Sequence, residues 1–187
     1  MVRTACTRWT TALVAIVVLA GCGGSGSGAA ADDGTRSTER GDVVALAEWQ
    51  QIELTDADGV AFALADLVGR PVFVENFATW CGNCRRQLGD TNRAAQRAGE
   101  DAVFVALSVE TDLDAADMAD YAAEQGFDHI RFAVMSPEML AAVKDAFGTK
   151  ALNPPSTPHV AVTADGTVGE MITGFDSPET ILSSLGL

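Results

Sequence analysis

Two cysteines separated by two residues, Cys81 and Cys84, constrain this chain more than any other feature. Their motif reads Trp80-Cys81-Gly82-Asn83-Cys84 and directly follows an apolar run, residues 71–77. The run is nearly continuous and rich in β-branched and aromatic side chains, which is typical of a strand buried on both faces. Residues 84–98 have the pattern of a helix. The motif therefore predicts a small, chemically usable disulfide where a buried strand passes into a helix.

The rest of the chain alternates strand and helix patterns. Before the motif we expect a β-hairpin and a short helical turn, and after it further strands, helices and a terminal hairpin. The expected strands are 49–54, 60–63, 103–109, 130–134, 160–163 and 168–173, and the expected helices are 64–69, 114–125, 136–147 and one opening at 177. Such an alternation indicates an α/β sandwich with a mixed sheet.

The chain divides into three parts by composition. Residues 1–21 carry two arginines and then an apolar run that is short for a membrane-spanning helix, which needs about 20 apolar residues, so we expect a signal peptide. Residues 22–41 contain glycine, serine, alanine and charge but almost no large apolar side chain, which predicts a flexible linker. Residues 42–187 suit one domain with one core.

The end of the first part resembles the lipobox of bacterial lipoproteins. Leu19-Ala20-Gly21-Cys22 would make Cys22 the mature, lipid-carrying N-terminus. We therefore expect a protein that is anchored by lipid to the outer face of the cytoplasmic membrane and does not span it. An ordinary secretory peptide and an uncleaved anchor are the alternatives.

Charge and cysteine content narrow the function. The formal net charge of −14 argues against nucleic acid as a partner. Cys6 lies in the segment that we expect to be removed, so no other cysteine besides Cys22 competes with the pair. A zinc site wants four ligands, whereas the domain offers two cysteines and two distant histidines, so we expect neither a metal nor another cofactor. A static disulfide is the other structural alternative.

The two cysteines are expected to differ in reactivity. Cys81 lies at the N-terminus of the predicted helix, where unpaired N–H groups and the helix dipole stabilise a thiolate. Cysteines in such motifs can have a pKa of about 3.5 to 7.5, compared with about 8.5 for a free thiol. We assign Cys81 as the exposed attacking thiolate and Cys84, one turn inward, as the thiol that resolves the mixed disulfide.

The order of elements resembles that of thioredoxin-fold proteins. More narrowly, the N-terminal hairpin and an extra βα unit resemble the membrane-tethered TlpA/ResA-like thiol-disulfide oxidoreductases. The most specific stretches are Phe77-Ala78-Thr79-Trp80-Cys81 and Thr157-Pro158-His159 through Asp165-Gly166, within a resemblance that covers nearly all of residues 48–187. The resemblance implies a thioredoxin-like fold in which helices flank a mixed central sheet.

Glu75 lies six positions before Cys81, inside the apolar strand. Burial there would desolvate its carboxyl group and raise its proton affinity. The resemblance implies that this acid exchanges a proton with Cys84. The alternative is a glutamate that reaches solvent or forms a salt bridge.

The resemblance also implies roles for residues around the disulfide. The Thr157–Pro158 bond would be cis, Pro158 would pack against the disulfide, and the exposed backbone of Thr157 would pair with an extended client segment. Trp80 would flank Cys81 as an apolar contact surface, with simple core packing as an equal alternative.

The resemblance thus implies a monomeric enzyme that transfers electrons to disulfides of envelope proteins, for example those of apocytochrome c or of copper-site proteins, and is recharged by an upstream membrane reductant. One alternative is a copper chaperone resembling Sco-type proteins, whose cysteines are spaced differently. Another is an oxidant resembling DsbA. Gly82-Asn83 separates the cysteines and departs from the proline-containing pairs of relatives, so the redox direction stays open.

Overall fold

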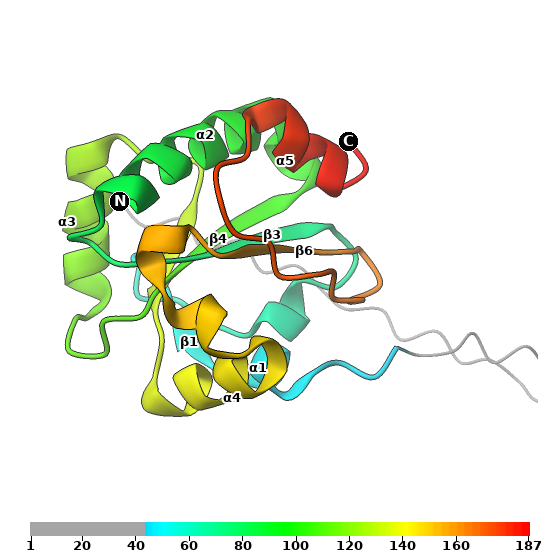
Figure 1. The fold of residues 1–187 in the computed structure, drawn as a ribbon, viewed down its shortest axis with the longest axis horizontal. Coiled ribbons are helices and arrows are strands. Elements are labelled where there is room, and N and C mark those ends of the chain that lie inside the picture. Colours follow the sequence, from blue (N-terminus) through cyan, green and yellow to red (C-terminus); the bar gives the residue numbers. More distant parts are fainter. Residues whose placement is uncertain (1–43) are drawn as a thin grey trace, which may run out of the picture. The chain divides into compact units, whose positions relative to one another are not determined.

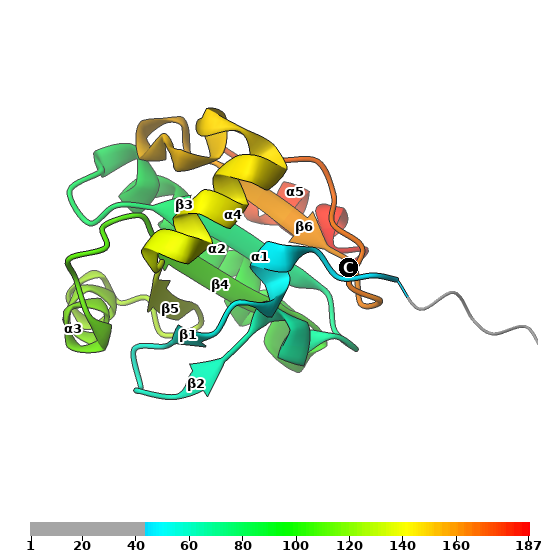
Figure 2. The ribbon, with the colours of Figure 1, turned by 90° about the horizontal axis from the view of Figure 1, so that it is seen from below.

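The apolar run in front of the cysteines forms the centre of the main sheet. This strand, β3 (Val72–Phe77), is buried at every residue. In the computed structural model, which describes residues 44–187, β3 pairs parallel with β4 (Val103–Ser108) and antiparallel with β6 (His159–Val162), and β4 pairs parallel with β5 (Arg131–Val134). The order β5-β4-β3-β6 is a mixed sheet (Figures 1 and 2), as the sequence predicts.

Helices cover both faces of this sheet because the side chains of β3 alternate between two apolar cores. Phe73 and Phe77 lie in one core, and Val72 and Val74 lie in the other. The helices of the first core are α2 (Gly82–Ala98), α3 (Ala115–Gln125) and α5 (Pro178–Ser184), and those of the second are α1 (Glu48–Gln51) and α4 (Pro137–Phe147). Figures 1 and 2 show α2 and α5 on one side of the sheet and α1 and α4 on the other. The expected helices flanking a mixed sheet are confirmed.

Three helices begin at side-chain caps that are visible in the sequence. The Ser136 hydroxyl accepts the N–H of Met139 at 3.1 Å, and a proline follows it at the first position of α4. Ser177 caps α5 in the same way, again before a proline, and the Asp114 carboxylate accepts two N–H groups at the start of α3. These caps satisfy N–H groups that the first helical turn cannot pair internally.

The N-terminal hairpin is shorter than expected. Its strands are β1 (Leu54–Thr55) and β2 (Ala61–Phe62), which pair antiparallel. The expected strand over 49–54 is wrong in its first half, because Trp49 and Gln50 lie in α1 and are both 2% exposed. Within α1, Trp49 packs in the second core, and the buried Gln50 amide donates to the Gly166 carbonyl at 3.0 Å.

A salt bridge and a backbone bond tie the hairpin to β5. Arg131 Nε lies 2.6 Å from Asp56 Oδ2, and the guanidinium group stacks over the Phe62 ring at 3.7 Å. The Ala57 N–H donates to the Phe132 carbonyl at 2.9 Å. The hairpin is therefore part of the folded domain, beside the sheet edge that β5 forms.

The C-terminal hairpin has one regular strand. The expected partner strand over 168–173 makes only two isolated bridges to β6, at Val168 and Ile172. Between them, a Cβ atom on Gly169 would lie 2.8 Å from the Ala161 carbonyl oxygen, so the two backbones approach too closely there for a side chain. Short 3-10 turns complete the domain: η1 (Leu64–Leu67), η2 (Gly99–Asp101), η3 (Thr149–Leu152) and η4 (Pro154–Ser156).

The expected signal peptide, the linker over 22–41 and Cys22 lie outside the described residues. Residues 44–187 all belong to one compact unit. Among the residues that the structure describes, no helix has the length and apolar character needed to cross a bilayer.

Candidate active site

The two cysteines of the motif lie at the junction that the sequence predicts. β3 ends at Phe77, a turn closes with the Cys81 N–H donating to the Ala78 carbonyl at 3.1 Å, and Cys81 is the N-cap of α2. Cys81 and Cys84 are joined by a disulfide with their Cα atoms 5.3 Å apart. One turn of α2 therefore holds both sulfurs at bonding distance.

The surroundings of the two sulfurs are unequal. The backbone N–H of Cys84 donates to Cys81 Sγ at 3.1 Å, so a donor at the helix N-terminus faces the outer sulfur. Cys84 Sγ lies 3.1 Å from the carbonyl oxygen of Pro154, which can only accept. In the reduced protein the first contact favours a thiolate on Cys81 and the second favours a protonated thiol on Cys84.

The expectation that Cys81 is exposed is wrong for the disulfide form. Cys81 is 2% exposed and Cys84 is fully buried, and both belong to the core beneath α2. The disulfide turns the outer sulfur back towards the helix, where Cys84 and its N–H already lie.

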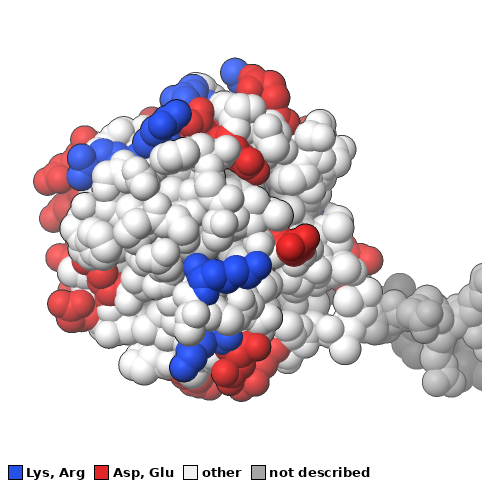
Figure 3. Space-filling model, in the orientation of Figure 1, with Lys and Arg blue, Asp and Glu red and all other residues white. Residues whose placement is uncertain are grey.

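Trp80 is on the surface, 64% exposed, although it is the neighbour of Cys81. Simple core packing is therefore excluded for this side chain. A second exposed aromatic residue, Phe175, stacks against the guanidinium group of Arg86 at 4.2 Å, on the second turn of α2. Figure 3 shows basic side chains along α2 and a broad uncharged area over η4 and the start of α2.

The loop before β6 contacts the disulfide in a different conformation from the expected one. No peptide bond is cis among residues 44–187, so the expected cis Thr157–Pro158 bond is wrong. The reversal of the chain is made instead by Thr157, whose φ of 48° lies in the left-handed region, and the peptide keeps the trans form that X-Pro bonds favour.

Thr157 is also buried, at 1% exposure, which contradicts its expected exposed backbone. Its N–H donates to the Pro154 carbonyl at 2.8 Å, and its carbonyl accepts from His159 Nδ1 at 2.9 Å. Its hydroxyl donates to the Gly174 carbonyl. Pro158 is also buried, and the Pro158 carbonyl accepts the Asn76 N–H at 2.9 Å. The left-handed turn thus leaves no free backbone group at Thr157 for a client strand.

Glu75 is fully buried in β3, so the alternative of a solvent-reaching glutamate is excluded. Its Oε2 accepts the Thr91 hydroxyl at 2.7 Å, and Oε1 has no hydrogen-bond partner within the described part of the chain. Burial raises the pKa of Glu75 to about 8, although the Thr91 bond opposes this. The carboxyl group is therefore mostly neutral at pH 7. No hydrogen bond within residues 44–187 joins it to Cys84.

The structure adds residues that the sequence analysis did not select. The Glu110 carboxylate accepts the Thr79 N–H at 2.6 Å and the Thr79 hydroxyl at 2.9 Å, beside the turn that leads to Cys81. Glu110 directly follows the strand predicted over 103–109, which lies beside β3. Its position in the sequence was therefore a signal that it lies near the turn that follows β3.

His159 also belongs to the loop network. Its Nε2 faces Asp176 Oδ2 at 3.1 Å. The backbone of Asp176 is held by the side-chain amide of Gln87, a buried residue one turn after Cys84. No sequence motif indicates this network, because its members are far apart in the chain.

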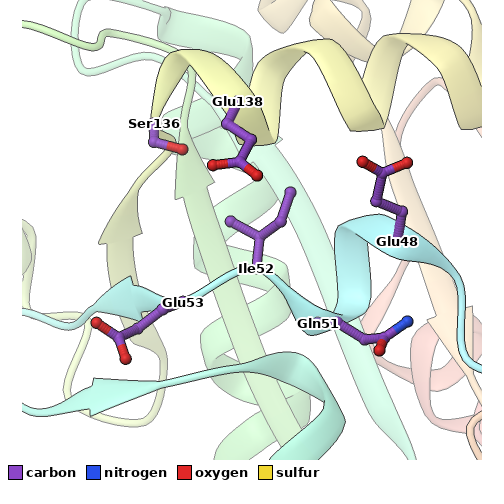
Figure 4. Close-up of a pocket in the computed structure, with 6 residues that line it drawn as sticks. All are labelled: Glu48, Gln51, Ile52, Glu53, Ser136 and Glu138. Atoms are coloured by element: carbon purple, nitrogen blue, oxygen red, sulfur yellow. The ribbon is translucent and has the colours of Figure 1, made fainter.

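Among residues 44–187, no group of three or more His, Cys, Asp or Glu side chains is arranged so that it could hold a metal ion. Both nitrogens of His159 are engaged, so this ring is not free to bind copper. A surface hollow of about 580 Å³ lies by α1 and α4, and Figure 4 shows Ile52 between the carboxylates of Glu48 and Glu138. These carboxylates do not converge on one point.

Solved structures confirm the fold. The exposed lipoprotein thioredoxin of Streptococcus pneumoniae is 22% identical, with a TM-score of 0.59 over 72% of this chain and 97% of that one. A thioredoxin-family thiol:disulfide interchange protein of Chlorobium tepidum is 24% identical, with a TM-score of 0.60 over 72% and 93%. Copper-bound ScoI of Bradyrhizobium japonicum is 17% identical, with a TM-score of 0.54 over 72% and 94%.

Sequence comparison gives the family. No curated protein matches the chain. The family model described as Redoxin matches residues 29–185, and these include the buried strand, both cysteines and the Thr157–Pro158 loop. The chain therefore belongs to the Redoxin family, whose thioredoxin-like fold here holds a redox-active Cys-x-x-Cys pair.

Proposed function

We propose that this protein is a thiol-disulfide oxidoreductase of the cell envelope, tethered to the membrane through Cys22, that reduces disulfides of client proteins. The observation that carries the proposal is the unequal pair of contacts at the motif. Cys81 Sγ receives an N–H donor at 3.1 Å, whereas Cys84 Sγ faces a carbonyl acceptor at 3.1 Å. This arrangement favours one thiolate and one thiol, which is the state that starts thiol-disulfide exchange.

The reaction has two exchange steps. The Cys81 thiolate attacks one sulfur of the client disulfide, forms a mixed disulfide and releases the other client sulfur as a thiolate. Cys84 then loses its proton and attacks Cys81, which forms the Cys81–Cys84 disulfide and releases the second client thiolate. The client gains two electrons and, once its thiolates take up protons, two hydrogens. An upstream membrane reductant returns two electrons to the pair.

Glu75 supports the second step through its charge state. A carboxyl group with a pKa of about 8 is mostly neutral at pH 7, so it opposes a thiolate on Cys84 much less than an ionised glutamate would. It can also take up and release a proton near neutral pH. Because no hydrogen bond joins the two groups within residues 44–187, proton exchange between them would need a rearrangement or a bridging water.

Clients would dock on the uncharged area beside the disulfide. Trp80 and Phe175 are exposed aromatic side chains that suit apolar contacts with a peptide. The backbone of Thr157 would contribute only if its bond to Pro154 opens. The clients that we propose are proteins with reducible cysteine pairs, such as apocytochrome c or copper-site proteins. A monomer suffices, since one chain supplies both cysteines.

The other two functions have less support. A copper chaperone would need a free histidine near the cysteines, and both nitrogens of His159 are bonded. An oxidant resembling DsbA would use the same groups in reverse, so the reduction potential decides the direction. A potential near that of thioredoxin, about −270 mV, indicates a reductant, and one near that of DsbA, about −120 mV, indicates an oxidant.

Paired cysteine variants test the exchange reaction. In reduction of insulin disulfides, Cys81→Ser is expected to abolish activity because the nucleophile is lost. Cys84→Ser is expected to stop turnover but to accumulate a mixed disulfide that dithiothreitol cleaves, visible on a non-reducing gel. Activity that survives in Cys81→Ser contradicts the proposal, and so does a Cys84→Ser protein that traps nothing.

The tether is tested by cell fractionation of the full chain in a host that processes lipoproteins. Cys22→Ala is expected to move the protein from the membrane to the soluble fraction, because two or more acyl chains are needed for stable anchoring. Cys6→Ala is the matched control, since it removes a cysteine from the segment that we expect to be cleaved, and it is expected to stay in the membrane fraction. Membrane retention of both variants contradicts lipidation at Cys22 when residues 1–21 have been cleaved from both, since an uncleaved apolar segment would itself hold the chain in the membrane.

A further inference from the structure

The turn that carries Cys81 is held by a carboxylate from a neighbouring strand. Glu110 Oε2 accepts the Thr79 N–H at 2.6 Å and the Thr79 hydroxyl at 2.9 Å. A third donor, the Ser108 hydroxyl, lies 3.4 Å from the same oxygen, and the Glu110 N–H donates to that hydroxyl at 3.2 Å. One carboxylate oxygen thus accepts from several donors just beyond the ends of β3 and β4, as an ionised carboxylate does.

Sheet register explains why Glu110 reaches this turn. β3 and β4 are parallel, with Phe77 opposite Ser108, so the two strands end side by side. The Val109 N–H still donates to the Phe77 carbonyl at 3.0 Å, and the next residue of each chain segment then leaves the ladder. Glu110 therefore emerges beside Thr79, two residues before Cys81.

Thr79 lies in the short connection between β3 and α2, whose ends, Ala78 and Cys81, are buried in the core. The turn itself contributes one backbone bond, from the Cys81 N–H to the Ala78 carbonyl. With both Thr79 donors bound to Glu110, the turn is fixed between β3 and α2, Trp80 is left on the surface and Cys81 is presented at the N-cap.

We propose that Glu110 is a positioning residue for the exchange reaction, an inference that rests on the proposed function of Cys81. It acts in two ways that can be separated. Its hydrogen bonds to Thr79 fix the geometry in which Cys81 meets a client disulfide. Its negative charge opposes the field of the helix N-terminus, so it raises the proton affinity of the Cys81 thiol and favours the disulfide state.

Two substitutions separate the effects. Glu110→Gln removes the charge and keeps an oxygen acceptor for Thr79, whereas Glu110→Ala removes both. Glu124→Gln is the matched control, because it makes the same chemical change far from the turn. Glu124 lies in the last turn of α3, and α3 connects the parallel strands β4 and β5, so its last turn lies where these strands begin and not where they end. All are made in the full chain. The reduced protein is alkylated at a series of pH values, and mass spectrometry of the Cys81 peptide gives the alkylation rate at each. The measured quantity is the pH at which this rate reaches half of its maximum.

Both Glu110 variants are expected to lower that midpoint by about 0.5 pH unit, and Glu124→Gln is expected to leave it unchanged. Only Glu110→Ala is expected to slow exchange with glutathione disulfide, by about tenfold at a fixed thiolate fraction. A midpoint that does not move in Glu110→Gln overturns the electrostatic part, and an unchanged rate in Glu110→Ala overturns the positioning part. If the Glu110→Ala chain fails to fold, Thr79→Val replaces it. Thr79→Val is expected to slow exchange two- to threefold, and a wild-type rate in this variant then overturns the positioning part.

The proposed function can fail separately. If the wild-type protein exchanges at the same rate as Cys81→Ser, the redox function is wrong and the positioning part falls with it, whereas the alkylation midpoint still tests the charge. If the wild-type protein exchanges normally and the Glu110 variants match it in rate and midpoint, only this inference is wrong.

Discussion

Two buried polar side chains, one on β3 and one on β6, have very different surroundings. Glu75 and His159 are directly paired in the antiparallel register, and both are buried. The His159 ring has a partner on each nitrogen, the Thr157 carbonyl and the Asp176 carboxylate. Glu75 has one partner, Thr91, and one oxygen with none in the described chain. Burial is shared, but only the glutamate is left poorly stabilised when charged.

This difference gives the two side chains different roles. A carbonyl oxygen can only accept, so Nδ1 of His159 carries a proton that fixes the Thr157 loop in place. The carboxyl group of Glu75 lacks comparable donors, so burial dominates and its pKa rises to about 8. We therefore expect Glu75 to control the pH dependence of the protein and His159 to control the stability of the loop.

The largest expected effect is that of Glu75→Gln. In the wild-type protein the pKa of Glu75 is about 8 when folded and near 4.5 when unfolded, so the folded state binds the proton more tightly. Stability is therefore lost as pH rises from about 4.5 to about 8, by up to about 5 kcal/mol. The substituted glutamine side chain cannot ionise, so the variant is expected to keep its stability over this range.

Urea unfolding of the oxidised protein at pH 5 and pH 9 measures this effect. From pH 5 to pH 9 the free energy of unfolding is expected to fall in the wild type and to stay nearly constant in Glu75→Gln. Glu124→Gln, a substitution of an exposed glutamate, is expected to follow the wild type within about 0.5 kcal/mol. Parallel stability profiles for Glu75→Gln and the wild type would mean that Glu75 is not the buried titrating group.

A smaller effect is expected from His159→Phe. The phenyl ring can keep the packing against Phe73, whose ring centroid lies 5.2 Å from that of His159, but it leaves the Thr157 carbonyl without its donor. An unsatisfied buried acceptor costs about 1–3 kcal/mol, so we expect a loss of about 2 kcal/mol in urea unfolding at pH 7. His129→Phe, at an exposed position, is the control. Equal losses from the two substitutions would contradict a fixing role.

The same contrast explains how far the sequence could be interpreted. The Cys81–Cys84 pair and the burial of Glu75 were predictable because they depend on regular elements, a buried strand followed by a helix N-terminus. The loop at Thr157 was not predictable. It is held by Pro154, Gly174 and His159, which form no periodic pattern, and its left-handed residue is a threonine.

The N-terminal hairpin shows a second limit of the sequence. Residues 49–54 contain apolar residues that fit a strand, yet Trp49 lies in α1 and packs edge-on against Phe147, with ring centroids 5.3 Å apart. A partner nearly a hundred residues away decides this conformation. Local pattern cannot reveal such a contact, whereas the lengths of β3 and β4 follow from pattern alone.

The smallest expected effect is that of Thr91→Val, which tests whether the Thr91 hydrogen bond limits the rise in the pKa of Glu75 to about 8. Valine has almost the shape of threonine but cannot donate to Glu75 Oε2, so the ionised carboxylate loses its one side-chain donor. The pKa of Glu75 is expected to rise further, and the variant is expected to lose about 1 kcal/mol more at pH 9 than at pH 5 in urea unfolding. Thr55→Val, an exposed substitution in β1, is expected to show no such pH dependence. Because the extra loss at pH 9 depends on an ionised carboxylate at position 75, it is expected to vanish in the Glu75→Gln background, where the glutamine oxygen accepts from Thr91 equally at both pH values. An extra loss that persists there would place its origin in some other contact of Thr91.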